Sequence, residues 1–368
     1  MKISNILKDL QNFKTIEWNK KEKKEICDYV EKLFLNTGFY IERFEKNWIY
    51  SIVISSKKSR KIDFLFSGHL DVVDADCKTW EYKEDEEYFY WRWVLDMKWA
   101  DAVMILSFLE NKDKILNSDK NFALMFTTDE ELWWENWVEY LIKDEWYTWK
   151  MVYIPDTWAW MDKYLKKWKW FLFWKFIIKW QEAHWCRPWK WKSSIDIFHN
   201  FYNDLYKEFP KAKNDVDWWE KISVNIWKIN WWFAVNQVMN NLEIETDIRF
   251  NPNIKLEEVE KKINKILKKH PEINFEKKFS FSWFKIDENS LYIKKYLDIV
   301  KKFYSKKIKD EKEYGSNDWR FFTNFTQDII MTWPFWYWYH WKNEKVSKKE
   351  LENFKNIFDS FILKLSIN

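Results

Sequence analysis

Short apolar runs alternate with amphipathic segments along the first part of the chain. Buried strands are predicted over Lys61 to Ser67 (KIDFLFS), Asn121 to Thr127 (NFALMFT) and Met151 to Ile154. Between them the spacing of apolar residues predicts helices over Ala100 to Glu110 and from about Trp134 to Ile142. Strands that alternate with helices are typical of an α/β layered sheet.

The pattern changes at about Trp170. Two amphipathic helices and several strands follow, predicted over Phe171 to Lys179, Ser193 to Tyr206, Ile222 to Lys228, Leu242 to Phe250 and Leu256 to Lys269. This predicts an α+β unit over residues 170–283, inserted into a domain built from residues 1–169 and 284–368. The last helix opens with Ser347 and Glu350 in capping-box spacing. It carries one apolar stripe, made of Leu351, Phe354, Ile357, Phe358, Phe361 and Leu365.

Charge and cysteine content exclude several classes of protein. Net charge is only +4, from 62 basic and 58 acidic residues, which argues against nucleic acid as the partner. Met1 to Phe13 reads as an amphipathic helix and not as a signal peptide, and no apolar run is long enough to span a bilayer. The three cysteines, Cys27, Cys77 and Cys186, are scattered, as in a protein of the reducing cytoplasm. We therefore expect a cytoplasmic protein without a membrane segment.

The glycine and tryptophan contents are abnormal. Glycine occurs 3 times and tryptophan 31 times, whereas a globular chain of this length carries roughly 26 glycines. The tryptophans cluster in turns, where the absence of a Cβ atom makes glycine useful. We hypothesise that most of them are glycines in the natural protein, written as tryptophan because UGA codons were read with the wrong code. UGG codons at Trp91, Trp93 and Trp99 would contradict this hypothesis; the rival is an aromatic surface that binds carbohydrate or single-stranded nucleic acid.

Candidate chemistry lies at the ends of the predicted strands. His69 and Asp71 follow the first buried strand (SGHLD), and the carboxylate of Asp71 can hold the far nitrogen of a metal-bound His69. The other candidate segments are Trp91 to Trp99 (WRWVLDMKW) with Asp96 in its centre, Thr128 to Glu131 (TDEE), Pro155 to Thr157 (PDT) with Asp156, and the turn-rich stretch around His340. Each carboxylate alone is most often a solvated surface charge, but five such segments in this order favour a metal site.

In this order and spacing, from about Ile62 to Val346, the segments resemble the zinc peptidase family of succinyl-diaminopimelate desuccinylase, acetylornithine deacetylase, aminoacylase and glutamate carboxypeptidase. The resemblance implies an α/β zinc-peptidase domain of three layers, with an inserted α+β lid that pairs two subunits into a homodimer. It also implies two Zn²⁺ ions, for which Co²⁺ or Mn²⁺ can substitute.

The resemblance assigns roles to individual residues. Asp96 would bridge the two zinc ions, His69 and Asp156 would complete the first site, and Glu131 and His340 the second. Glu130 would be the general base, and Asp71 the carboxylate behind His69. Two zinc ions roughly 3.5–4 Å apart can polarise a carbonyl group, and a nearby carboxylate can take the proton of the attacking water.

The inserted unit also resembles the lid of that family. Gln181 to Pro188 (QEAHWCRP) matches a loop in which His184 would stabilise the tetrahedral oxyanion across the dimer. Asn236, Arg249 and Gly315 match positions that hold the substrate, Arg249 through a bidentate grip on a carboxylate. A structural ion pair is the alternative for Arg249.

The resemblance implies hydrolysis of the amide bond of an N-acyl amino acid, or of a short peptide with a free carboxylate. The alternative is a catalytically silent homologue that acts as a binding or scaffold protein. It would follow if the tryptophans that stand where the family has glycine, beside Asp96, Glu131, His184 and His340, block the turns.

Overall fold

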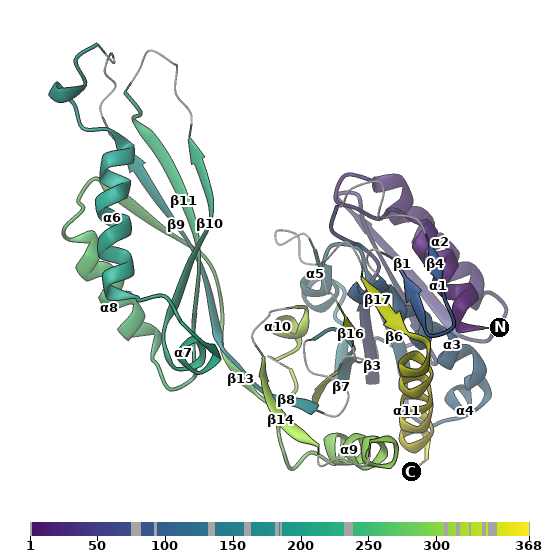
Figure 1. Ribbon diagram of the computed structural model, residues 1–368. Helices are drawn as coiled ribbons and strands as arrows, with labels where there is room; N and C mark the ends of the chain where they lie inside the picture. Colours follow the sequence, from purple (N-terminus) through teal and green to yellow (C-terminus); the bar gives the residue numbers. More distant parts are fainter. Residues whose placement is uncertain are drawn as a thin grey trace. The chain divides into compact units, whose positions relative to one another are not determined.

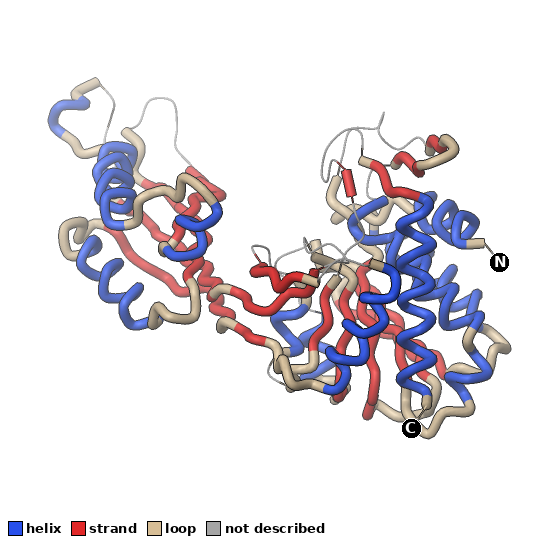
Figure 2. The backbone as a smooth tube through the Cα atoms, turned by 60° about the horizontal axis from the view of Figure 1, so that its bottom comes forward, coloured by secondary structure: helices blue, strands red, loops and turns tan. Residues whose placement is uncertain are grey.

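The computed structural model describes residues 2–74, 82–91, 94–131, 137–157, 163–180, 184, 186–231, 238–304, 308–313, 317–323, 325–332, 336–337 and 344–367. The chain divides into two units, one formed by Met1–Lys166 with Ile286–Asn368 and the other by Lys167–Lys285 (Figure 1). Each unit has its own sheet, and helices accompany the strands in both (Figure 2).

The first unit is built on a mixed six-stranded sheet. Its strands, in spatial order, are β1 (Tyr40–Lys46), β2 (Ile49–Ser55), β6 (Phe122–Thr127), β3 (Lys61–His69), β7 (Thr148–Ile154) and β15 (Ile329–Met331). β1, β2 and β6 pair antiparallel, whereas β6, β3, β7 and β15 run parallel. The central parallel strands are buried apolar runs, as expected for a sheet with covered faces. This confirms the predicted α/β class.

Helices cover this sheet through aromatic contacts. The helices of the first unit are α1 (Ile3–Asn12), α2 (Lys20–Phe34), α3 (Trp99–Glu110), α4 (Lys112–Leu116), α5 (Trp137–Lys143), α9 (Leu291–Phe303), α10 (Trp319–Phe322) and α11 (Lys348–Ser366). Phe64 and Phe66 project from the same face of β3. Phe64 contacts Tyr292 of α9, and Phe66 contacts Phe108 of α3 and Phe358 of α11, with ring centroids 5.0–5.5 Å apart. Burying each such ring contributes about 1.5–3 kcal/mol.

The C-terminal helix confirms its predicted cap and stripe. The Ser347 side chain accepts a hydrogen bond from the backbone amide of Glu350. All six residues of the predicted apolar stripe are buried. A small sheet of the first unit is formed by β4 (Lys83–Glu84), β5 (Tyr88–Tyr90), β16 (Trp336–Tyr337) and β17 (Lys345–Ser347). A separate three-stranded sheet contains, in spatial order, β13 (Phe284–Lys285), β8 (Lys163–Trp168) and β14 (Lys309–Glu313).

The second unit is an antiparallel sheet with two long helices. Its strands, in spatial order, are β10 (Ser223–Trp231), β11 (Asn241–Phe250), β9 (Trp170–Lys179) and β12 (Ile273–Phe281). The helices α6 (Ser194–Glu208) and α8 (Leu256–Leu267) bury their apolar residues in one core with this sheet, and α7 (Asp215–Glu220) and a short turn, η3 (Pro188–Lys190), complete the unit. Ser193 and Asp196 form a capping box at the start of α6.

Candidate active site and metal centre

Three parallel strands end at one edge of the central sheet and bring the predicted residues there. β3 ends at His69, opposite Thr127 at the end of β6, and β7 ends at Ile154. Glu130 and Asp156 follow β6 and β7 within three residues. Because the carboxyl ends of parallel strands share one edge, the side chains of these segments converge, at the place where open α/β sheets bind ligands.

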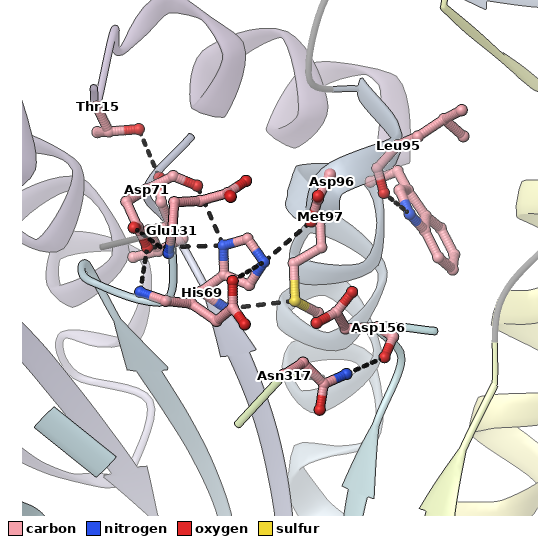
Figure 3. A network of polar contacts seen from close by, with 12 residues as sticks. Thr15, His69, Asp71, Leu95, Asp96, Met97, Glu131, Asp156 and Asn317 are labelled. Carbon is pink, nitrogen blue, oxygen red and sulfur yellow. Dashed lines mark hydrogen bonds and ion pairs between the residues drawn. The ribbon is translucent and has the colours of Figure 1, made fainter. Parts of the chain in front are cut away.

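His69 lies at the centre of this edge and is almost fully buried (2% exposed). Its Nδ1 atom lies 3.1 Å from the carbonyl oxygen of Asp71, and its Nε2 atom lies 3.0 Å from Oδ1 of Asp96 (Figure 3). The same Nε2 atom lies 4.0 Å from Oε2 of Glu130. A carbonyl oxygen can only accept, so Nδ1 carries the proton of the neutral imidazole. The lone pair of Nε2 then faces two carboxylates, an arrangement that needs a proton or a metal cation in between.

The donor set fits such a cation. Ligand atoms of His69, Glu130 and Asp156 lie within 4.8 Å of one another. The Oε1 atom of Glu131 is buried and has no hydrogen-bond partner among the described residues. Imidazole nitrogen and carboxylate oxygen are the donors that catalytic zinc uses. The residues at this edge are therefore suited to hold a divalent metal ion.

The electrostatics of the site agree with this. Burial raises the pKa of Glu130 well above its ordinary value, and the neighbouring Asp156 adds to the shift although His69 opposes it. Burial, followed by repulsion from Asp96 and Glu130, likewise raises the pKa of Glu131. Burial alone would lower the pKa of His69, but the carboxylates of Asp71 and Asp96 outweigh it and raise the pKa. This cluster of buried carboxylates would therefore be stabilised by a bound cation.

Asp71 connects two of the motifs. Its Oδ1 atom accepts a hydrogen bond from the backbone amide of Glu130 (3.2 Å), and its Oδ2 atom accepts one from that of Glu131 (3.0 Å). The Oδ1 atom lies 3.6 Å from Nδ1 of His69, farther than the carbonyl oxygen of the same residue. The carboxylate therefore fixes the turn that carries both glutamates and also lies beside the imidazole.

The turn that carries Asp96 is held from both sides. It is a kinked segment, η2 (Val94–Lys98), that leads directly into α3; the backbone angles of Asp96 and Met97 are not helical, and the peptide bond between these two residues is cis. The backbone amide of Leu95 donates to the Glu344 carboxylate (2.8 Å), and the carbonyl oxygen of Leu95 accepts from the indole of Trp99 (2.7 Å). Trp99 is fully buried against Phe354, so the structure accommodates this indole in the core.

Several supporting residues were missed at the sequence level. Thr15 donates to the carbonyl oxygen of Leu70 (2.5 Å), and Nζ of the buried Lys98 donates to the carbonyl oxygens of Leu10 and Phe13 (3.0 and 2.6 Å). These bonds tie the N-terminal segment to the motif that follows β3 and to the segment that carries Asp96. No local pattern marks such contacts, because each joins residues more than fifty positions apart and uses a backbone carbonyl group.

Of the other predicted site residues, three lie outside the described part of the chain and two are described. Asn236, Gly315 and His340 lie outside the described residues. His184 is exposed, and its Nδ1 atom accepts a hydrogen bond from the backbone amide of Cys186 (3.2 Å). Arg249 forms a close ion pair with Asp247, with Nε and Nη2 lying 2.6–3.0 Å from its carboxylate oxygens. The structural ion pair considered for Arg249 is therefore present.

The fold and this donor set define a metal-dependent hydrolase with a catalytic domain and an inserted α+β unit. A family model, Peptidase family M20/M25/M40, matches residues 65–364, and the chain belongs to this family. It is thus a hydrolytic enzyme of a metallopeptidase family.

Individual relatives agree with the family. A succinyl-diaminopimelate desuccinylase of Blochmanniella pennsylvanica is 33% identical over 113 residues, which cover 29% of this chain and only 29% of that relative. An M20 family metallo-carboxypeptidase of Sulfolobus solfataricus superimposes with a TM-score of 0.78 at 15% identity, over 100% of both chains. A tripeptidase of Staphylococcus aureus gives a TM-score of 0.75 at 16% identity, over 100% of this chain and 98% of its own. The two structural matches show the fold alone.

None of the described helices combines the length and apolar character needed to cross a membrane.

Proposed function

We propose that this chain uses two zinc ions to hydrolyse the amide bond of an N-acyl amino acid, or of a short peptide with a free carboxylate. The observation that carries the proposal is the convergence of His69, Asp96, Glu130 and Asp156 at one edge of the sheet. Asp96 would bridge the two ions, with His69 and Asp156 completing one site. Glu131 and His340 would complete the other.

The chain's own residues supply the proton chemistry. Bound zinc would polarise the scissile carbonyl group and lower the pKa of the attacking water. Glu130 would take a proton from that water and pass it to the nitrogen of the leaving amine. Asp71 would hold Glu130 in place through its backbone amide and His69 through its Nδ1 atom. His184 would stabilise the oxyanion.

The substrate class rests on two features. One is the match to a succinyl-diaminopimelate desuccinylase, which covers 29% of that relative. The other is Arg249, whose planar guanidinium group can bind a substrate carboxylate with two hydrogen bonds. This requires that the substrate carboxylate replace that of Asp247 in the present ion pair. Asn236 and Gly315 would complete the substrate contacts. N-succinyl, N-acetyl and peptidyl substrates all fit this description.

We also assign the inserted unit, residues 170–283, the role of a lid that pairs two subunits, between the two parts of the catalytic domain at 1–169 and 284–368. The scattered cysteines favour a cytoplasmic enzyme.

Two zinc ions per chain are expected when metal-free protein is dialysed against zinc and analysed by elemental analysis. Co²⁺ or Mn²⁺ should occupy the same sites. Amine release from a panel of N-succinyl amino acids, N-acetyl amino acids and dipeptides should then require the metal and identify the acyl group. Zinc bound without turnover of any panel member would place the substrate outside this class. Absence of bound zinc would support the silent-homologue alternative, which the comparisons do not favour.

We further propose that most of the tryptophans are glycines in the natural protein. Four non-glycine residues of the described chain have positive φ: Asn36, Asn47, Trp48 (φ 65°) and Trp146 (φ 60°). Asparagine tolerates this conformation, but a bulky side chain does not. Both tryptophans are also exposed, at 57% and 76%, so burial does not offset the strain. Peptide mass spectrometry of the natural protein would identify the residue at each position.

Replacing Trp48 or Trp146 by glycine is expected to raise the free energy of unfolding by about 1 kcal/mol each, because the left-handed strain is removed. Trp18→Gly is the matched control. Trp18 is similarly exposed (68%) but has no positive φ, so glycine there should be neutral or destabilising. Chemical denaturation of the three variants measures the differences. An equal effect at all three positions would remove the backbone argument.

A further inference from the structure

Asn317 joins the C-terminal part of the first unit to the loop after β7. Its side chain is buried (7% exposed), and its Nδ2 atom donates a hydrogen bond to the carbonyl oxygen of Asp156 (Figure 3). The other end of the same amide is also engaged, since Oδ1 accepts from the backbone amide of Trp319 (2.9 Å). The carbonyl oxygen of Asn317 accepts from Nη1 of the buried Arg320 (3.2 Å).

The bonds to Trp319 and Arg320 hold the Asn317 amide in place independently of Asp156. The Oδ1 bond to Trp319 sets which way the amide faces, because an asparagine side chain offers one acceptor end and one donor end. Arg320 holds the backbone of Asn317 through a charged donor. The amide that meets the Asp156 carbonyl is therefore a fixed group, anchored at the start of α10.

A fixed donor on the carbonyl of Asp156 restricts the peptide plane that follows this residue. The direction of the Cα–Cβ bond is coupled to that plane, so the carboxylate is aimed as well. Asp156 lies two residues past the end of β7, which ends at Ile154. Its carboxylate must nevertheless lie within reach of the same ion as His69 and Glu130.

We propose that Asn317 is a positioning residue for Asp156 and that its amide donor raises the affinity of the site for a divalent metal ion. The inference rests on the proposed function, in which Asp156 is a metal ligand. Groups that orient metal ligands typically contribute 10- to 100-fold to metal affinity. Asn317 contacts neither the metal nor the substrate in this account and acts through Asp156 alone.

Asn317→Asp removes the hydrogen-bond donor and keeps the size and shape of the side chain. The substitution keeps an oxygen for the Trp319 amide but places an acceptor against the Asp156 carbonyl. We expect zinc affinity, measured by competition with a chromophoric chelator, to fall about 10- to 100-fold. At saturating zinc the KM should stay near that of the unchanged protein, because no substrate contact is altered.

Asn121→Asp is the matched control. Asn121 is also buried (3% exposed), and its Nδ2 atom donates to the carbonyl oxygens of Ser59 and Lys61 (3.1 and 2.9 Å). These carbonyl groups lie at the start of β3, at the opposite end of that strand from His69. The control should lose stability in thermal unfolding and keep its zinc affinity.

Zinc affinity of Asn317→Asp within twofold of the unchanged protein would overturn the inference, as would an equal loss in Asn121→Asp. If the aspartate variant does not fold, Asn317→Ala, which removes the donor without adding a charge, should show the same direction of change. Failure of the proposed function is distinguishable, because the unchanged protein would then bind no zinc in the same titration.

Discussion

Glu130→Gln is expected to lower kcat by about 100- to 10,000-fold while zinc binding is retained, because the amide cannot accept the proton of the attacking water. Glutamine has nearly the same shape as glutamate, and the turn should persist, since the hydrogen bond to Asp71 comes from the backbone amide of residue 130. Steady-state kinetics on the substrate identified by the panel, together with metal analysis, measures both quantities.

Two control variants distinguish a general base from a metal ligand and from a surface residue. Glu131→Gln should lose zinc as well as activity, because Glu131 is assigned to a metal site. Glu139→Gln should change neither, because that glutamate lies on α5 and forms a surface ion pair with Lys143. If Glu130→Gln instead releases zinc, Glu130 is a ligand, which its place with His69 and Asp156 also permits. A loss of kcat smaller than tenfold would remove the role of general base.

The sequence was sufficient to predict the edge of the sheet on which the site lies. Apolar runs followed by His69, by Glu130 and by Asp156 become three neighbouring parallel strands, and strand direction alone then brings the three residues together. The same reasoning did not reach β1 and β2. β1 is an edge strand with a largely polar sequence (YIERFEK), which lacks the alternation that marks a half-buried strand. β2 (IYSIVIS) is an apolar run buried along its whole length, of the same kind as the runs that predicted β3 and β6.

Support for the site could not be predicted, for a physical reason. Thr15, Lys98 and Asn317 act through hydrogen bonds to backbone carbonyl groups of Leu70, Leu10 and Asp156, respectively. A backbone carbonyl group is present at every residue, so the sequence contains no information about which one is used. Only the path of the chain selects the pair. Motifs reveal groups that need particular side chains, whereas packing decides what holds them.

Gly68 connects this packing to the site. A Cβ atom at position 68 would lie 2.2 Å from Oδ1 of Asp101 and 3.0 Å from Cε of Met104, both on α3. It would also lie 3.3 Å from Cε of Met97. The sulfur atom of Met97 accepts a hydrogen bond from the backbone amide of His69 (3.3 Å). The glycine therefore allows α3 to approach the end of β3 next to the central histidine.

Gly68→Ala is accordingly expected to lower the free energy of unfolding by about 2–3 kcal/mol, the upper part of the range for overpacking a close-packed core. The nearest clash is with Asp101, whose carboxylate oxygens are buried and have no hydrogen-bond partner among the described residues. In the background of Asp101→Ala the same substitution should cost less than about 1 kcal/mol, so that the double-mutant cycle gives a coupling of at least about 1 kcal/mol.

Gly38→Ala provides the contrasting case for this cycle. Gly38 has φ 97°, so alanine there is strained by its backbone conformation whatever surrounds it. Its cost should be the same with or without Asp101→Ala, because its nearest neighbour is Leu116 and not Asp101. Urea denaturation of the single and double variants supplies all the required free energies. An unchanged cost of Gly68→Ala in the Asp101→Ala background would show that Met104 and Met97, and not the carboxylate, set the limit on how closely α3 approaches His69.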